Sequence, residues 1–259
     1  MPIEAEVQTA YRKYARDYFQ ARLEGGLRNR VNNFTELPSM LEALGDLNGK
    51  MLLDIGCGPG IHAREYVLRG AMVTGVDVTS GMVEMAREYC PTATFHPATT
   101  YDLPFGDDSF DLVTASLMVF HLDDPARAFK EVKRVLKDNG KFLYSDLSPF
   151  YLARGNNRDG ANIYRALGHI RDQASGEIQV FQGNFEEDIV DEVPLVSGAT
   201  VKCYRRMFGS NVRIIAEAGL ALVDYRNCFP TSEFEAVRPE AYQILKSMPP
   251  YCIYVTEKR

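Results

Sequence analysis

The feature that most constrains the fold is the stretch LLDIGCGPG at residues 52–60, in which an apolar run ending in an acidic residue leads into a glycine-rich loop. Gly56, Gly58 and Gly60 occupy alternate positions of that loop. Glycine tolerates a positive φ and lets the backbone approach a ligand, and the helix that follows would offer its free N–H groups. Ligands of open α/β sheets bind outside the carboxyl ends of the strands, so the loop predicts a ligand site after the first strand.

Two nucleotide-like ligands compete for such a loop, a dinucleotide and S-adenosylmethionine. The dinucleotide fingerprint G-x-G-x-x-G would place its third glycine at the position of Ile61. Asp54 would face the negative charge of a pyrophosphate, whereas S-adenosylmethionine carries an ammonium and a sulfonium group that attract a carboxylate. Asp77, which ends the second expected strand, can accept hydrogen bonds from the ribose of either ligand. The residues favour S-adenosylmethionine and leave an NAD-dependent oxidoreductase as an alternative.

Short apolar segments alternate with amphipathic ones between residues 50 and 146. Strands are expected at residues 50–55, 71–77, 93–97, 110–116 and 141–146, and later at 221–228 and 251–259. An amphipathic helix is expected at 124–137, closed by the sequence DNG, and another helix near 209–218. This pattern predicts an α/β fold with a Rossmann-like, doubly wound, mostly parallel seven-stranded sheet and helices on both faces.

The chain is expected to form a single domain over residues 1–259, in which a lid and an inserted cap flank the sheet. A helix at 4–24 and a second one starting near Pro38 precede the first strand. The region after residue 147 is rich in Gly, Asn, Asp and Arg and has one alternating run, at 176–185, that indicates a strand. The segments are 1–37 for the N-terminal helical lid, 38–147 for the cofactor-binding core, 148–205 for the cap and 206–259 for the last helix and strands.

Composition excludes several classes of partner. The formal net charge is −6, the pI is about 5.4 and the basic residues are dispersed, so no face for nucleic acid is expected. The longest uncharged apolar run, residues 112–120, is far shorter than the ~18 residues of a membrane span, and the N-terminus has no signal-peptide core. Five cysteines without a CxxC pair and four scattered histidines predict no metal site. We expect a cytoplasmic protein.

Several motifs follow one another in an order that carries a family resemblance. LLDIGCGPG at residues 52–60, GVDVTSGMVEMA at 75–86 and the stretch at 100–146 resemble the successive motifs of class I S-adenosylmethionine-dependent methyltransferases, specifically the small-molecule branch. The resemblance covers residues 38–147. It implies S-adenosylmethionine as the cofactor and S-adenosylhomocysteine as its product.

The resemblance also implies how the cofactor is held. The methionine end would be lined by Asp54, Gly56, Cys57, Gly58 and Gly60. Asp77 would hold the ribose, and the residues packed against the sulfonium would be Ser116, Leu117, Met118 and His121.

The adenine would pack against Val78 and Met82. Thr99 and Thr100 stand where the family usually has an Asp-Ala pair, which removes a charged contact to the adenine amino group. A hydroxyl group, or the backbone amides of Thr100 and Tyr101, would serve that group instead.

Tyr11, Tyr14 and Tyr18 fall on one face of the expected N-terminal helix. Ordinary packing explains such a stripe as well as a function does. The functional interpretation is a lid whose residues Tyr11 and Tyr18 meet the cationic end of the cofactor.

Methyl transfer needs a general base only when the acceptor is a poor nucleophile. The candidates are His121, His169 and Tyr204. His121 follows the fourth strand at the mouth of the sheet, where a hydrogen-bonding role in the wall is an equally open interpretation. His169 and Tyr204 lie in the expected cap.

The segment after the fourth strand reads SLMVFHL and lacks an Asn-Pro-Pro-aromatic motif, which disfavours methylation of a nucleobase or a glutamine amide. We therefore expect a small-molecule acceptor, methylated on oxygen or nitrogen before carbon, and a monomer or homodimer. A protein that binds S-adenosylmethionine for another reaction, or only as a ligand, stays an alternative.

Overall fold

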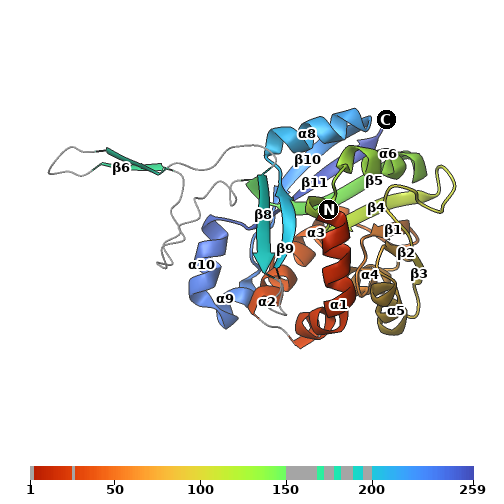
Figure 1. Ribbon diagram of the computed structural model, residues 1–259, viewed down its shortest axis with the longest axis horizontal. Helices are drawn as coiled ribbons and strands as arrows, with labels where there is room; N and C mark the ends of the chain where they lie inside the picture. Colours follow the sequence, from red (N-terminus) through yellow and green to blue (C-terminus); the bar gives the residue numbers. More distant parts are fainter. Residues whose placement is uncertain (1–2, 25–26, 150–167, 172–177, 182–188, 195–199) are drawn as a thin grey trace.

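The computed structural model describes residues 3–24, 27–149, 168–171, 178–181, 189–194 and 200–259. A seven-stranded sheet with the order β10-β11-β5-β4-β1-β2-β3 forms its centre (Figure 1). The strands are β1 (Met51–Ile55), β2 (Met72–Asp77), β3 (Thr94–Pro97), β4 (Phe110–Ser116), β5 (Leu136–Leu147), β10 (Leu220–Asn227) and β11 (Tyr251–Lys258). Strands β1 to β5 are parallel, and β11 runs antiparallel to both β5 and β10. The predicted mostly parallel seven-stranded sheet is confirmed.

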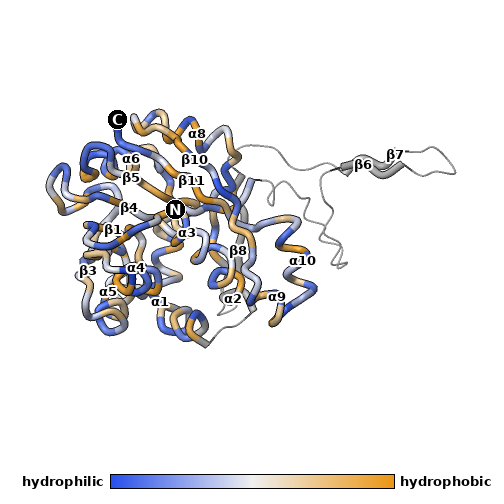
Figure 2. Tube along the Cα trace, turned by 180° about the vertical axis from the view of Figure 1, so that it is seen from behind, coloured by the Kyte–Doolittle hydropathy of each residue, from blue (hydrophilic) through white to orange (hydrophobic). Residues whose placement is uncertain are grey.

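Helices cover both faces of this sheet and bury two separate cores. On one face, α6 (Pro125–Val135) and α8 (Phe208–Glu217) pack over sheet residues such as Phe142 and Tyr144. On the other face, α3 (Glu36–Leu44), α4 (Ile61–Leu68) and α5 (Ser80–Tyr89) pack over residues such as Leu52 and Leu143. Successive strand residues point to opposite faces, so neighbours such as Phe142 and Leu143 enter different cores. In Figure 2 the inner strands are coloured mainly as hydrophobic.

The boundary between α6 and β5 differs from the predicted helix at 124–137. Helix α6 ends at Val135, and the next residue, Leu136, is fully buried and pairs with Phe110 in the sheet. The sequence DNG does not follow a helix there but lies inside β5, where Asn139 has a φ of 59° and the register with β4 shifts. Burial of Leu136 in the sheet therefore ends the helix earlier than its apolar stripe indicated.

Three helices precede the sheet. They are α1 (Ile3–Glu24), α2 (Leu27–Phe34) and α3, so the helix expected to start near Pro38 begins at Glu36 and follows a separate short one. Proline is tolerated in the first turn of a helix, which explains its place inside α3. The ring of Phe19 on α1 lies edge-on to Tyr89 of α5, with centroids 5.1 Å apart. Helix α1 is thereby docked against the edge of the sheet domain (Figure 1).

The expected cap, residues 148–205, contains two antiparallel hairpins within the described residues. β6 (Gly168–Arg171) pairs with β7 (Ile178–Phe181), which falls in the run predicted as a strand, and β8 (Ile189–Pro194) pairs with β9 (Thr200–Arg205). Two further helices, α9 (Ser232–Val237) and α10 (Pro239–Ser247), were not predicted and connect β10 to β11. The proposed division into lid, core and cap stays a prediction.

Candidate active site

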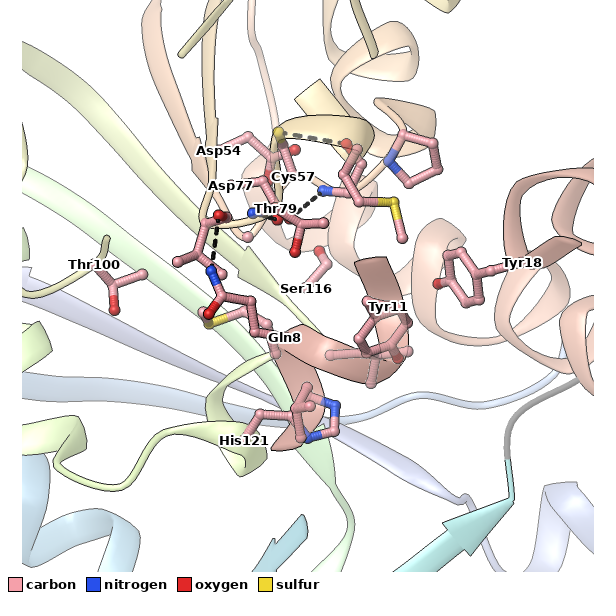
Figure 3. Close-up of a pocket in the computed structure, with 18 of the residues that line it drawn as sticks. Gln8, Tyr11, Tyr18, Asp54, Cys57, Asp77, Thr79, Thr100, Ser116 and His121 are labelled. Carbon is pink, nitrogen blue, oxygen red and sulfur yellow. Dashed lines mark hydrogen bonds between the residues drawn. The ribbon is translucent and has the colours of Figure 1, made fainter. Parts of the chain in front are cut away.

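A cavity of about 380 Å³ lies between α1 and the carboxyl ends of β1, β2 and β4 (Figure 3). The structure brings most of the predicted cofactor residues to its wall, namely Tyr11, Tyr18, Asp54, Gly56, Cys57, Gly58, Asp77, Val78, Met82, Thr99, Thr100, Tyr101, Ser116, Leu117, Met118 and His121. Gly60 and Tyr204 do not line it, and the side chain of His169, in β6, lies outside the described part of the chain. The volume is at the lower end of the roughly 300–1,000 Å³ of small-molecule sites.

The glycine-rich loop needs glycine for two different reasons. Gly56, Gly58 and Gly60 have φ values of 66°, 52° and 83°, which lie in the left-handed region. A Cβ atom on Gly56 would also lie 2.8 Å from Cγ of Met118, so this glycine lets the loop touch the segment after β4. Gly60 is the N-cap of α4 and packs on Ala86 behind the cavity, which explains its absence from the wall.

Asp54 ends β1 as a buried carboxylate with an unused oxygen. Its Oδ1 accepts a hydrogen bond of 2.9 Å from Oγ1 of Thr114, while its Oδ2 has no partner. Burial raises the pKa of Asp54 to about 6, although His62 and Thr114 oppose the rise. Ser116, at the end of β4, also lines the cavity with a buried hydroxyl that has no partner. Two orphaned oxygens in one wall indicate a ligand that donates hydrogen bonds and carries positive charge.

Asp77 ends β2 and is held by the backbone. Its Oδ2 accepts from the Gly58 amide at 3.0 Å, and its Oδ1 accepts from the Thr79 amide at 2.8 Å. Burial raises the pKa of Asp77, and these two bonds oppose the rise. Each carboxylate oxygen has a second lone pair, so the side chain keeps the capacity to accept from two hydroxyl groups.

The wall beyond Asp77 is mostly apolar. Val78 and the buried Met82 flank it, and Oγ1 of Thr99 accepts a bond of 3.3 Å from the amide of Tyr101. The hydroxyl of Thr99 is therefore engaged within its own turn, whereas Thr100 lines the cavity as a nearly buried side chain. This arrangement suits a flat heterocycle.

Helix α1 supplies the opposite wall. Nε2 of Gln8 donates to the carbonyl of Val78 at 3.2 Å, and the rings of Tyr11 and Tyr18 meet edge to face at 5.5 Å (Figure 3). Burial raises the pKa of the Tyr11 phenol. Tyr14, on the same helix, does not line the cavity, so only part of the tyrosine stripe faces it.

The sequence reasoning missed Arg22, which lines the cavity from the last turn of α1. Only 3% of its surface is exposed, its Nε has no partner, and it makes no ion pair within the described residues. The charge of Arg22 lowers the pKa of the buried Glu36, but no ion pair joins the two residues within the described chain, so a negative group of the ligand is the expected partner of Arg22. The signal was available, since Arg22 follows Tyr18 by four positions and thus shares its helical face.

A second missed set lies behind the glycine-rich loop. Glu36 of α3 is fully buried and contacts Nε2 of His62 at 2.7 Å. Glu36 also accepts a hydrogen bond of 2.7 Å from the hydroxyl of Ser145. The oxygen of that Ser145 hydroxyl in turn accepts a hydrogen bond of 2.9 Å from the amide of Leu117. Burial by itself would raise the pKa of Glu36, but His62, the hydrogen bond from Ser145 and the charge of Arg22 outweigh it and lower the pKa. This network ties α3, α4 and the segment after β4 together and holds Leu117 at a φ of 53°.

His121 ends η1 (Val119–His121), the 3-10 turn after β4, and lines the cavity. Its Nδ1 lies 3.4 Å from the carbonyl oxygen of Lys202, and its ring lies 6.1 Å from that of Tyr11. Burial lowers the pKa of His121 to about 4, so the imidazole is neutral at physiological pH. Because a carbonyl only accepts, this contact requires the hydrogen on Nδ1 and leaves Nε2 with a free lone pair. Tyr204 instead donates to Asp123 at 2.9 Å.

Two further features bear on the chemistry. No group of three or more His, Cys, Asp or Glu side chains that could hold a metal ion occurs within the described residues. Over the same residues, none of the helices has the length and apolar character needed to cross a membrane.

The fold and the cavity agree with the resemblance to class I S-adenosylmethionine-dependent methyltransferases seen in the sequence. Residues 53–144 match the family described as Methyltransferase domain. The chain is 34% identical over 121 residues to a ubiquinone biosynthesis O-methyltransferase of Alkalilimnicola ehrlichii and 31% identical over 109 residues to a demethylmenaquinone methyltransferase of Renibacterium salmoninarum. These matches cover 45% and 42% of this chain and 49% and 46% of the relatives, so the chain spans about half the length of the curated relatives it matches.

Solved structures match over more of the chain. An S-adenosylmethionine-dependent methyltransferase of Mesorhizobium loti has a TM-score of 0.65 at 24% identity, covering 91% of this chain and 99% of that one. The magnesium protoporphyrin IX methyltransferase of Synechocystis PCC 6803, solved with bound S-adenosylhomocysteine, has a TM-score of 0.61 at 14% identity and covers 99% and 100%. At sequence identities of 24% and 14%, these similarities show that the chain shares the fold of the two solved structures. S-adenosylmethionine, and not NAD, is the cofactor of the class.

The residues of the cavity fit S-adenosylmethionine. The orphaned oxygens of Asp54 and Ser116 match its ammonium donors, the accepting capacity of Asp77 matches a ribose, and Arg22 matches a carboxylate. The ammonium, the ribose and the carboxylate are three separate groups of one molecule, so the match between the cavity and S-adenosylmethionine is specific.

Proposed function

We propose that this protein transfers the methyl group of S-adenosylmethionine to a hydroxyl oxygen of a small-molecule acceptor, with His121 as the general base. The observation that carries the proposal is the neutral imidazole in the cavity wall, whose Nδ1 is held by a backbone carbonyl. When bound, S-adenosylmethionine supplies a methyl group on a positively charged sulfur.

Binding of the cofactor is assigned to three charged side chains. Asp54, together with the hydroxyl of Ser116, would accept from its ammonium, Arg22 would pair with its carboxylate, and Asp77 would accept from its ribose. Tyr11 and Tyr18 cover this end from α1 and exclude water. Exclusion of water strengthens each of these charged contacts and favours an in-line approach of the acceptor.

A neutral His121 suits an oxygen acceptor. A hydroxyl group is a poor nucleophile until its proton is removed, and Nε2 of His121 takes that proton. The low pKa keeps the base in its accepting form, although it also makes His121 a weaker base than an exposed imidazole. A neutral amine would not need this proton transfer, so the histidine favours oxygen over nitrogen.

The acceptor is proposed to be a small, largely apolar molecule. The wall near His121 is formed by Val7, Met118, Leu122 and the ring of Tyr11. Two curated relatives are named as O-methyltransferases, one for ubiquinone biosynthesis and one for malonyl-[acyl-carrier protein] from Legionella pneumophila, and these names support an oxygen acceptor.

A direct test uses S-adenosylmethionine labelled in its methyl group. The protein is incubated with panels of phenols, carboxylic acids and amines, and the labelled product and S-adenosylhomocysteine are quantified together. We expect equal amounts of both with a phenol or another hydroxyl compound. Transfer to amines only would overturn the oxygen assignment, and cofactor binding without transfer to any acceptor would support a binding protein or a different reaction.

The role of His121 is tested by His121→Ala and His121→Gln with the acceptor that turns over. We expect kcat to fall roughly 10² to 10⁴-fold while the affinity for S-adenosylhomocysteine stays nearly unchanged. The pH profile of the wild type should rise with the deprotonation of His121 at about pH 4 and be level at neutral pH. An unchanged kcat in both variants would remove His121 from catalysis.

A further inference from the structure

The short turn that carries His121 depends on its surroundings for stability. η1 has three residues and two backbone bonds of its own, from His121 to the Met118 carbonyl at 2.9 Å and from Leu122 to the Val119 carbonyl at 3.0 Å. A 3-10 turn of this length has poor hydrogen-bond geometry and little stability by itself. The position of the imidazole is therefore decided by what the turn contacts.

Strand β9 and the residue after it hold η1 and the two residues that follow it at three points. The Lys202 carbonyl meets Nδ1 of His121, and the Tyr204 hydroxyl donates to Asp123. Arg206 donates to the two carbonyls on either side of the histidine, through one terminal nitrogen to Val119 at 3.2 Å and through the other to Leu122 at 2.6 Å.

Arg206 is itself fixed in place. It is 5% exposed, and its guanidinium carbon lies 4.3 Å from the centroid of the Tyr204 ring. The planar fork of the guanidinium allows one side chain to serve two acceptors in a defined geometry, which a lysine ammonium does less well. Asp146 lies near enough that the Arg206 charge opposes the rise of its pKa.

We propose that Arg206 is a positioning residue for the proposed base: by clamping the carbonyls of Val119 and Leu122 it holds the His121 imidazole in the cavity wall with Nδ1 on the Lys202 carbonyl and Nε2 free. The inference rests on the proposed function of His121, and its first test does not need an acceptor.

The chain offers a matched control for this clamp. Arg134 also donates to two backbone carbonyls, those of Phe105 at 2.7 Å and Leu103 at 3.0 Å, but it fastens the loop before β4 and is not in contact with η1. Loss of either arginine should destabilise the protein, whereas only loss of Arg206 should change the environment of His121.

The experiment is an NMR titration of the protein labelled with ¹⁵N-histidine, without ligand. The chain has four histidines, and the signals of His121 are those absent from His121→Ala. In the wild type we expect hydrogen on Nδ1 and a pKa of about 4. In Arg206→Met the pKa should move toward the unperturbed value of ~6.5 and the other tautomer should appear. Arg206→Lys should give an intermediate result and Arg134→Met the wild-type one.

The outcomes separate the inference from the proposed function. If His121 keeps its wild-type tautomer and pKa in both Arg206 variants, or if Arg134→Met changes them as much, the positioning role is wrong. A second outcome is that the tautomer and the pKa of His121 change in Arg206→Met while kcat with the accepting compound falls by less than about tenfold. The positioning role would then stand, and the assignment of His121 as the base would fail. Arg206→Lys serves as the test if the methionine variant does not fold.

Discussion

The two walls of the cavity are built in different ways. The sheet wall consists of strand ends and the glycine-rich loop, where Asp54 and Asp77 project from β1 and β2 and the loop amide of Gly58 donates to Asp77. The opposite wall consists of side chains on α1 and on η1, two segments that lie about a hundred residues apart in the sequence. The first wall is set by backbone conformation and the second by the docking of separate elements.

This difference has a consequence for tolerance to substitution. A wall built from the backbone tolerates few substitutions, because a residue such as Gly56 must adopt a positive φ and also leave room for Met118. A side-chain wall can change its chemistry without changing the fold, because residues such as Tyr18 and Arg22 can be replaced on the face of α1 that lines the cavity. We therefore expect substitutions in the sheet wall to affect folding and those in the helix wall to affect binding.

The largest effect is expected for Gly56→Ala. A left-handed conformation costs a non-glycine residue about 1–2 kcal/mol, and the overlap with Met118 adds about 1–3 kcal/mol. Chemical denaturation of the unliganded protein should show a loss of roughly 2–5 kcal/mol in the free energy of unfolding. Gly58→Ala is the matched control, because its φ is also positive but no atom lies within 4 Å of its Cβ position. Equal losses in the two variants would contradict the role given to Met118.

A smaller but specific effect is expected for Arg22→Met. Loss of a buried charged hydrogen bond of about 1.5–3 kcal/mol should weaken S-adenosylhomocysteine binding by roughly 10 to 100-fold. Calorimetry with the analogue that lacks the carboxylate should show the same affinity for the wild type and the variant. The exposed Arg12 of α1, which does not line the cavity, gives the control Arg12→Met. An equal loss for both ligands would make Arg22 a structural residue, and no loss for either would place the carboxylate elsewhere.

The pH dependence of binding isolates Asp54. Its pKa is raised from 3.8 to about 6 in the folded protein, so the native state binds the proton more tightly than the unfolded chain. The stability of the unliganded protein should therefore fall as pH rises through the window from 3.8 to 6. The cationic ligand needs the ionised form, so its affinity should rise about tenfold between pH 5 and 7. Asp54→Asn should bind weakly at both pH values, and a persistent tenfold rise in that variant would assign the titration to another group.

The smallest effect is expected for Tyr18→Leu. An edge-to-face aromatic pair contributes about 0.5–1.5 kcal/mol, so loss of the contact with Tyr11 should weaken S-adenosylhomocysteine binding by roughly three- to tenfold. Tyr14→Leu, which removes a ring that does not line the cavity, should leave the affinity unchanged. A similar loss in both variants would mean that the tyrosines act only by stabilising α1.

The sheet wall could be predicted from the sequence because its determinants are local. Asp54, the three glycines and Asp77 stand at fixed distances from apolar runs, and a strand end followed by glycines has few conformations. The boundary of α6 could not be read in the same way. Its apolar stripe continues through Leu136, and only the pairing with Phe110 ends the helix there.

Residues joined only by tertiary structure could not be predicted. Glu36 and Ser145 are 109 positions apart, and nothing near either residue indicates that they share a hydrogen bond. The contact between His121 and Lys202 spans 81 positions and depends on how β9 packs on η1. Arg22 was predictable in principle, since it shares a helical face with Tyr18, but a charged residue near a helix C-terminus also suits the helix dipole.

The hydrogen-bonded group around Glu36 bears on where this protein could be cut. The stretch that matches the methyltransferase domain, residues 53–144, contains His62 but neither Glu36, which precedes it in α3, nor Ser145, which follows it directly. A fragment with those ends would leave His62 without its carboxylate and Leu117 without the hydroxyl that holds its backbone. The stretch shared with the family is thus smaller than the unit that these contacts hold together, and a transplantable module would have to begin before α3 and continue through β5.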